Sequence, residues 1–550
     1  MASIALLAPV LLPLVAAAVI AAFGFGGFNF GRIAAGAGAW AALLALLALW
    51  LPLRSTQELN LGPLGFGSPF QLRIDAVAFA FGLMVLAPAA LVLTLQRRSW
   101  QEAALGALGV AAAMGAIEAG GVVLTALAGG TAATLAVIQL DGEDIRAPRP
   151  RWSMLLAAWL ALSLAGVILQ VRSGTAAYAA IPVSALTAPV FALIAFAGVL
   201  ASGLVPWRSW PAQVWSRPSL RAAGLVVATL FPLGFYLLVR SYEMGDGKYP
   251  HVAFNAVLAT WGVAVALGAA ARAQSAATRR GFLGEVIPGI GGFALMTVAL
   301  GTPLGLVAGL VTLAFAAAMT ACLSLLPDRA GPASLVAIAA AVGLPPALGF
   351  GARIVGIEST FEAGDFFGFI GVAAAVAWVV WMMAGARATG LPAGRGRPAL
   401  ETFPRVAMAV ATITVVGGPA LALIQSAFAN PAEADVMPLL SGAVSGGLMS
   451  VVTVSTVLPV VALFVPMLII GVVAFGTAGT SLIRTQPRPA LFSLPWAGAI
   501  DRLRQEAAAA TLPEQYRSIL DLRAFEAAAA GGRPLIWIAS LAALAFAVTR

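Results

Sequence analysis

A succession of long apolar runs constrains the fold of this chain more than any other feature of its sequence. There are about sixteen such runs, each of roughly 17–25 residues, which is enough for an α-helix to cross the hydrocarbon core of a bilayer. The chain has 550 residues, of which 61% are hydrophobic and only 10% are charged. Soluble domains carry far fewer apolar residues. The sequence therefore predicts an all-α polytopic membrane protein.

The predicted spans make up about 14 core transmembrane helices followed by a C-terminal extension. They lie near 2–23, 31–53, 74–95, 103–118, 120–140, 153–171, 186–206, 220–240, 253–271, 282–300, 303–326, 333–356, 367–386, 403–428, 457–482 and 534–549. The polar, Gly- and Ser-rich stretch 436–456 is either re-entrant or a further span. The first run lacks a basic leader and a small-residue cleavage site, so we expect a retained span rather than a signal peptide.

Positive charges are concentrated in alternate connections between the runs, and this predicts the orientation. From residue 32 to residue 435, one set of connections carries seventeen arginines, and the opposite set carries Arg54, Arg73, Arg172, Arg240 and Lys248. Cytoplasmic loops of membrane proteins are enriched in Lys and Arg. We therefore expect the N-terminus outside and a location in the bacterial inner membrane. This pattern accounts for the net charge of +9 without a nucleic-acid partner.

Cysteine and histidine are too scarce to build a metal centre or a disulfide framework. The chain has one cysteine, Cys322, which lies inside an apolar run, and one histidine, His251, in a connection. Haem, iron–sulfur and structural zinc sites need several such ligands. We expect no disulfide, no metal site and no cofactor.

The stretch 485–533 is the only long segment with the pattern of a water-exposed helix. Within 499–510, apolar side chains share one face opposite charged ones, and Thr511 with Glu514 forms a plausible capping box for a second amphipathic helix. The sequence predicts a C-terminal amphipathic lateral helix of two pieces along the cytoplasmic surface. Residues 534–550 then form a terminal transmembrane anchor.

Two adjacent prolines, Pro345 and Pro346, interrupt the run 333–356. Proline removes a backbone donor and clashes with the preceding turn, so the pair predicts a broken helix with free carbonyl groups at membrane depth. A single cation, Arg353, follows the break. It either bridges the freed carbonyls, which we expect, or holds an anion.

Five short segments follow one another in a particular order and spacing. They are Asp75–Ala78, Pro206–Pro211, Gly234–Arg240, Arg279–Arg280 and Gly343–Phe350. Together they resemble motifs of the antiporter-like membrane subunits of respiratory complex I, membrane-bound hydrogenases and multisubunit cation/proton antiporters. The C-terminal strap of residues 485–550 resembles that of the largest member of this family.

The resemblance implies two inverted five-helix repeats, and an odd number of spans per repeat gives the opposite orientations that such a pair requires. The implied organisation is as follows: 1–100, N-terminal transmembrane helices; 101–240, first repeat; 241–390, second repeat; 391–484, C-terminal transmembrane helices; 485–533, amphipathic helices; 534–550, anchor.

The departures from the family pattern concern its proton relay, a mid-membrane row of lysines and a glutamate. The resemblance places four of the relay positions on residues that cannot titrate, namely Gly130, Ala201, Pro232 and Gly289. The loop histidine corresponds to Arg208 and a further lysine to Arg353, and arginine stays protonated in proteins. The sequence therefore predicts that the relay is largely lost.

The charged residues that remain near or within the spans are the candidates for an ion pathway: Glu285, Arg279, Arg353, Arg208, Asp75 and Glu118. Intramembrane carboxylates are costly and mark functional sites by default. For Glu285 we weigh transport against pairing with Arg280 or Arg279, and expect pairing.

For three other candidates, a structural role is the alternative to a role in an ion pathway. We expect an interfacial ion pair between Asp75 and Arg73, and a solvated side chain for Glu118 at the outer end of its span. Arg208 lies among tryptophans that suggest an interfacial belt, and it could pair with a carboxylate of a neighbouring chain.

Two functions remain open from the sequence. The first is an antiporter-like membrane subunit of a complex I-related assembly, of the quinone oxidoreductase or hydrogenase type, nominally translocating protons but acting as a scaffold among other membrane subunits. At most it is a non-catalytic subunit of an ion-translocating oxidoreductase. The alternative is the membrane partner of a gradient-driven inorganic-carbon uptake complex with a large soluble zinc subunit. A self-contained cation/proton exchanger is disfavoured, because the predicted core lacks groups that bind Na⁺ or exchange protons.

Overall fold

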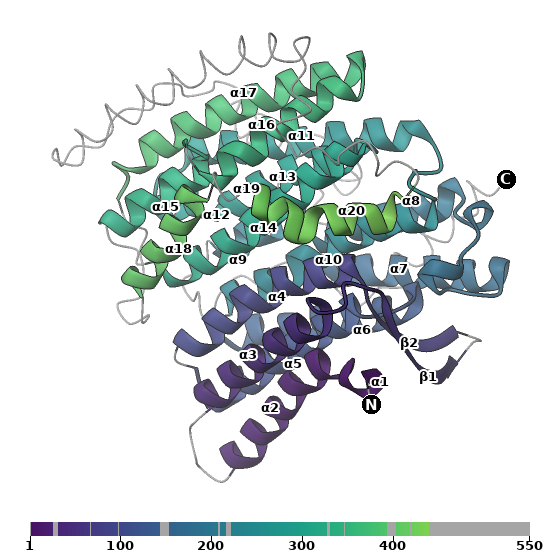
Figure 1. Cartoon of the computed structure of the whole chain (residues 1–550). Coiled ribbons are helices and arrows are strands. Elements are labelled where there is room, and N and C mark those ends of the chain that lie inside the picture. Colours follow the sequence, from purple (N-terminus) through teal and green to yellow (C-terminus); the bar gives the residue numbers. More distant parts are fainter. Residues whose placement is uncertain are drawn as a thin grey trace, which may run out of the picture.

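The computed structural model shows a bundle of long helices that lie side by side (Figure 1). It describes residues 2–25, 31–65, 68–96, 98–143, 153–206, 209–215, 222–326, 331–345, 347–392, 403–417 and 421–438. Within these ranges, 11 helices are long and apolar enough to cross a membrane. The predicted fold class, an all-α polytopic membrane protein, is confirmed. The predicted elements beyond residue 438 lie outside the described residues.

The first half of the bundle runs from the N-terminus to the centre of the molecule. Its elements are α1 (Ala2–Ala5), α2 (Ala8–Phe25), α3 (Gly31–Trp50), β1 (Gln57–Gly65), β2 (Ser68–Ile74), α4 (Ala76–Leu95), α5 (Trp100–Ile117), α6 (Val122–Glu143), α7 (Ser153–Ser173), η1 (Tyr178–Ala180), η2 (Val183–Ala185), α8 (Ala188–Ala201), α9 (Trp210–Trp215) and α10 (Ala223–Met244).

The second half continues away from the N-terminal helices. Its elements are α11 (Val252–Ser275), α12 (Arg279–Gly284), α13 (Val286–Val298), α14 (Pro303–Leu325), α15 (Pro332–Val342), α16 (Leu348–Glu362), α17 (Asp365–Ala388), α18 (Pro404–Val416), α19 (Leu421–Ile424), the π-helix η3 (Gln425–Ala429) and α20 (Asn430–Val436). In Figure 1, α17 lies at one edge of the bundle, and α2 and α3 lie at the other.

A β-hairpin closes one end of the bundle, and the expectation of purely helical structure omits it. Strands β1 and β2 pair antiparallel, with Leu59 opposite Leu72. An isolated bridge from Leu72 to Ala119 joins the α5–α6 loop to the hairpin, and one from Gly121 to Ala177 joins that loop to the connection after α7. Alternating apolar and polar residues in β2 favour a strand. We call this the hairpin end; α4 and α6 begin there, and α5 and α10 end there.

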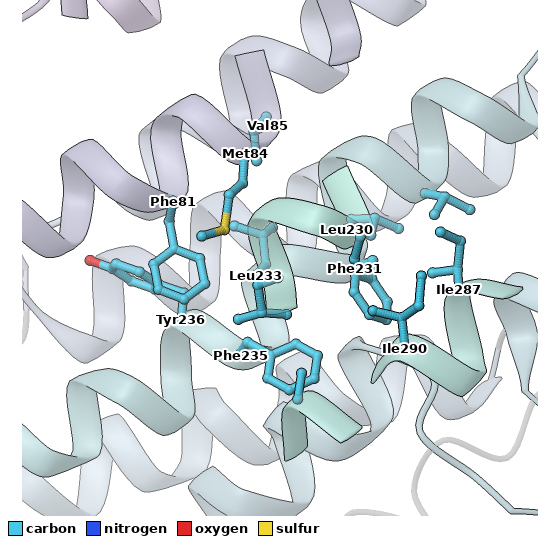
Figure 2. Packing of buried hydrophobic residues seen from close by; sticks show 14 of the residues in the cluster. Phe81, Met84, Val85, Leu230, Phe231, Leu233, Phe235, Tyr236, Ile287 and Ile290 are labelled. Carbon is cyan, nitrogen blue, oxygen red and sulfur yellow. The ribbon is translucent and has the colours of Figure 1, made fainter. Parts of the chain in front are cut away.

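Helix α10 lies at the centre of the bundle, where every residue except Glu243 is buried. Figure 2 shows its apolar side chains between those of two neighbours: Phe81 and Met84 of α4 on one side, and Ile287 and Ile290 of α13 on the other. All four side chains are at most 3% exposed. The middle of the bundle is thus filled by hydrophobic side chains.

The fourth helix of each predicted repeat is interrupted. Helix α8 ends at Ala201, and the short helix α9 begins only at Trp210. In the second repeat, α15 ends at Val342 and α16 begins at Leu348, with Pro345 in the connection and Pro346 outside the described residues. The two predicted repeats thus have the same order of long and broken helices; their inverted relation stays a prediction.

Candidate functional site

Asp75 and Arg240 form a buried ion pair at the hairpin end. Asp75 caps the N-terminus of α4, since its Oδ1 accepts from the backbone N–H of Ala78 at 2.8 Å. Arg240, near the end of α10, donates from Nη1 to Oδ2 at 2.7 Å and from Nη2 to Oδ1 at 2.8 Å. A bidentate pair of this kind fixes the relative orientation of the two helices.

Three further charges extend this pair into a network: Arg73, Glu243 and the exposed Glu58, which lies 3.6 Å from Arg73. Arg73 Nε lies 3.0 Å from Asp75 Oδ2, and Arg73 Nη1 contacts Glu243. Arg240 Nη1 also donates to Glu243 Oε2 at 2.7 Å. Burial raises the pKa of Asp75, but Arg240 and Arg73 outweigh burial and hold it below its usual value. Asp75 is therefore ionised and paired, as a structural group rather than a proton carrier.

The network reaches the α5–α6 loop through Tyr236. Arg240 Nε donates to the Tyr236 hydroxyl at 2.9 Å, and that hydroxyl donates to the carbonyl of Ile117 at 2.6 Å. The sequence placed Arg240 in a family-like motif but not among the site candidates. The signal for its role was a single charge at the end of an otherwise apolar span, which calls for a partner.

Glu118 is fully buried, and the expectation of a solvated side chain is therefore wrong. The loop that carries it is held as an additional strand, since its carbonyl accepts from the N–H of Arg73 at 2.6 Å and Ala119 bridges Leu72. Both carboxyl oxygens of Glu118 lack a hydrogen-bond partner among the described residues. Burial raises the pKa of Glu118 well above its ordinary value, which favours the protonated, neutral form.

Glu285 lies at the junction of α12 and α13, and its partner is Arg272 rather than Arg279 or Arg280. Arg272, on α11, donates from Nε to Oε1 at 3.0 Å and from Nη2 to Oε2 at 2.9 Å. Arg272 also donates to the carbonyl of Pro206, at the end of the α8 segment. This pair joins three elements at the end of the bundle opposite the hairpin.

Arg279 binds backbone carbonyls at that same end. Its guanidinium donates to the carbonyls of Thr389 at 3.3 Å and Leu391 at 3.0 Å, just beyond α17. In return, Arg387 of α17 donates to the carbonyls of Gln274 and Ala276, at the end of α11. Cations near helix C-termini satisfy free carbonyls and the helix dipole. This geometry gives Arg279 a capping role.

Arg353 closes the break between α15 and α16. Its Nη2 donates to the carbonyl of Ala341 at 3.0 Å, and Trp381 Nε1 donates to the same oxygen at 3.1 Å. Trp378 Nε1 donates to the neighbouring carbonyl of Val342 at 2.8 Å. These donors satisfy carbonyls that the end of α15 leaves without helical partners. Of the two alternatives for Arg353, the structure places it on freed carbonyls.

Aromatic rings surround the Arg353 guanidinium. Its carbon lies 5.3 to 6.0 Å from the ring centroids of Phe293, Phe315 and Trp378. Gly343 has a positive φ of 71°, and any Cβ there would collide with Nη1. Cation–π contacts stabilise a buried guanidinium, and no ion pair to an acidic side chain occurs within the described ranges. Arg208 and Trp207 lie outside the described residues.

The positions of two relay lysines lie at a close crossing of helices. Ala201 is fully buried at the end of α8, and Pro232 lies inside α10. There a Cβ on Gly198 would meet the carbonyl oxygen of Gly234 at 2.8 Å, and one on Gly234 would meet the Gly198 oxygen even closer. The two backbones are therefore in direct contact at Gly198 and Gly234, within one helical turn of both relay positions.

The other two relay positions lie against tryptophans. The nearest foreign atom to a Cβ on Gly130 would belong to Trp159, at 3.6 Å, and a Cβ on Gly289 would lie 3.7 Å from both Ala269 and Trp381. No group of three or more His, Cys, Asp or Glu residues suited to a metal ion occurs in the part of the chain that the structure describes.

No protein-family model and no curated protein matches this sequence. Solved structures do match. A chain of the Mrp complex from Dietzia sp. DQ12-45-1b has a TM-score of 0.66 and 21% identity over 98% of this chain and 63% of that chain. This chain thus spans less than two thirds of the Mrp chain.

Two respiratory complexes contain similar chains. In the archaeal membrane-bound sulfane sulfur reductase, the TM-score is 0.62 and the identity 17%, over 75% of this chain and 76% of that one. In respiratory complex I from Thermus thermophilus, they are 0.63 and 19%, over 81% of this chain and 100% of that one. This chain therefore shares its fold with chains of these three membrane complexes, in agreement with the resemblance seen in the sequence.

Proposed function

We propose that this chain is an antiporter-like membrane subunit of a complex I-related multisubunit assembly, of the quinone oxidoreductase or hydrogenase type, and that it serves there as a scaffold rather than as a proton pump. Its partners are other membrane subunits. The fold shared with chains of three membrane complexes supports the first part of this proposal.

The crossing of α8 and α10 supports the second part of the proposal, the scaffold role. Proton transfer through a membrane needs side chains that lose and regain a proton at membrane depth. At this crossing the polar side chain is that of Ser202, whose hydroxyl donates to the carbonyl of Phe231 at 2.8 Å. Ala201 and Pro232 stand where the resemblance places lysines. Arg272 on α11 and Glu285 at the start of α13 are bound to each other.

The distribution of positive charge supports a location in the bacterial inner membrane with the hairpin end outside. Among the described residues, Arg98, Arg272 and Arg279 lie at the end opposite the hairpin. Cytoplasmic ends of membrane proteins are the positively charged ones. This orientation places the N-terminus outside.

Purification of the native complex in mild detergent, followed by mass spectrometry of its components, tests the proposal. We expect paralogous membrane subunits together with flavin or iron–sulfur proteins. A single large soluble zinc protein as the sole stoichiometric partner would contradict the proposal and would favour the inorganic-carbon uptake complex.

A further inference from the structure

The last described helical segments, η3 and α20, contain three buried polar atoms that lack hydrogen-bond partners. These atoms are Nε2 of Gln425, Oδ1 of Asn430 and Oε1 of Glu433. The side chains of Gln425 and Glu433 are each only 2% exposed. Buried polar groups without a partner are rare, and each one calls for water, an ion or a proton that completes it.

A π-helical turn brings the first two of these residues onto one face. The segment Gln425–Ala429 is π-helical, and the N–H of Asn430 donates to the carbonyl of Gln425, five residues earlier. Glu433 follows three residues after Asn430, which is the spacing of neighbours on a helix surface. Single π turns inside α-helices occur frequently at functional sites.

The described helices packed against α20 offer Glu433 no free cation. The exposed Lys248 lies in the loop after α10, next to Gly247, which packs on Met437. Helix α20 packs on α4, α10 and α14. The charged groups on these elements are Asp75 at the start of α4, and Arg240 and Glu243 on α10; α14 has no Asp, Glu, Lys or Arg. Arg240 is already bound to Asp75 and Glu243.

The other carboxylate on α20, that of Asp435, has a hydrogen-bond partner. Asp435 Oδ2 accepts from the N–H of Ala76, at the start of α4, at 2.8 Å. The titratable tyrosines of α10 are also engaged, since Tyr236 donates to Ile117 and Tyr242 donates to the carbonyl of Val298 at 2.7 Å. Glu433 therefore differs from Asp435 in having a carboxyl oxygen that nothing in the described protein satisfies.

The donor or acceptor character of the three unpartnered atoms limits which groups can bond to them. Asn430 Oδ1 and an ionised Glu433 Oε1 are both acceptors, so they cannot bond to each other, whereas Gln425 Nε2 is a donor. A bare cation would satisfy the two oxygens but not the amide nitrogen. Water both donates and accepts, and a proton on Glu433 turns its carboxyl group into a donor.

We propose that Glu433 is a proton-binding site at the hairpin end, and that bound water connects it with Asn430 and Gln425. The site lies apart from the relay positions and goes beyond the proposed scaffold function. Burial raises the pKa of Glu433 to about 7 and that of Asp435 to about 6, and both carboxylates lie beyond the predicted span 403–428. A proton from the phase at the hairpin end exchanges with this site near neutral pH.

Infrared titration of the carboxyl C=O band tests this site in the full chain, reconstituted in lipid nanodiscs. We expect a protonated carboxyl band with one component that disappears near pH 7 and a second, from Asp435, that disappears near pH 6. The component near pH 7 should be missing in Glu433→Gln. The matched control, Asp246→Asn, removes an exposed carboxylate at the same end and should leave the band unchanged. Asn430→Leu should raise the midpoint of the Glu433 component by about one pH unit, because it removes an atom that orders water at the carboxylate.

Two results would overturn the proposal. One is a higher-pH component that persists unchanged in Glu433→Gln. The other is a midpoint that Asn430→Leu leaves in place, since water organised by this face would then play no part. Because glutamine keeps the shape of the side chain, the Glu433→Gln protein should fold, and its monodisperse elution from size-exclusion chromatography verifies this.

Discussion

Arg240 and Asp75 share two hydrogen bonds of 2.7 and 2.8 Å, with both side chains buried at the hairpin end. The pair joins the end of the central helix α10 to the start of α4, across 165 positions of sequence. Both residues belong to segments that resemble family motifs. The two motifs thus meet in one ion pair, and we expect this pair to hold α4 to α10.

Asp75→Asn should destabilise the protein strongly. The substitution leaves a buried guanidinium short of one counter-charge, and breaking a buried pair in this way costs about 3–5 kcal/mol. The apparent melting temperature in a fixed detergent should fall clearly below that of the wild type. Asp246→Asn is the control, because Asp246 is exposed and asparagine tolerates its positive φ.

A second arm of the same experiment replaces both partners. The double variant Asp75→Leu with Arg240→Met should recover part of the stability that Asp75→Asn loses, because it leaves no unpaired charge of this pair. If Asp75→Asn melts with the wild type, the pair does not hold α4 to α10.

Glu118→Gln should stabilise the protein at pH 8 and leave it unchanged in acid. The folded-state pKa of Glu118 is raised by burial, so the folded chain keeps this proton while the unfolded chain loses it above roughly pH 4.3. The stability of the wild type should therefore fall as the pH rises from there toward the folded pKa. Glutamine is neutral at every pH and removes this loss.

Thermal melts of the wild type and Glu118→Gln at pH 4.5 and pH 8 check this prediction. The difference between the two proteins should appear at pH 8 only. A variant that is less stable than the wild type at pH 8 would mean that an ionised Glu118 has a stabilising partner.

Gly234→Ala should loosen the crossing of α8 and α10. Its Cβ would overlap the carbonyl oxygen of Gly198, and overpacking of this kind costs about 1–3 kcal/mol. Gly331→Ala is a matched control, since a Cβ there meets nothing within 4 Å and its φ is extended. A melting temperature lowered equally in both variants would contradict the close crossing.

Glu285→Gln should reduce stability without changing ion translocation by the native assembly. It weakens two charge-assisted hydrogen bonds to Arg272, and bonds of this type contribute about 1.5–3 kcal/mol. Proton pumping per electron, measured in membrane vesicles at equal complex content, should match the wild type. A collapse of pumping in an assembly that stays intact would make Glu285 part of a pathway.

The sequence predicted an all-α membrane protein, because apolar runs of spanning length follow directly from the physics of the bilayer. It also indicated Arg353 as a ligand of freed carbonyls, since the break at Pro345 and the nearby cation are close in sequence. Contacts of this local kind can be read from spacing alone.

Long-range partners were harder to predict. Glu285 has three arginines within thirteen residues, and spacing along the chain could not select Arg272 over Arg279 and Arg280. The burial of Glu118 depends on a loop that pairs as a strand with β2, which no helical periodicity reveals. Glu433 was missed because the predicted apolar span 403–428 ends before it, although two carboxylates, Glu433 and Asp435, follow that span.

Proton conductance of the purified chain in liposomes tests the scaffold account most directly. With a potassium diffusion potential imposed by valinomycin, the internal pH should change no faster than in protein-free liposomes, because the relay positions Ala201 and Pro232 cannot carry protons. A potential-driven proton flux well above that background, proportional to the amount of protein, would contradict the account.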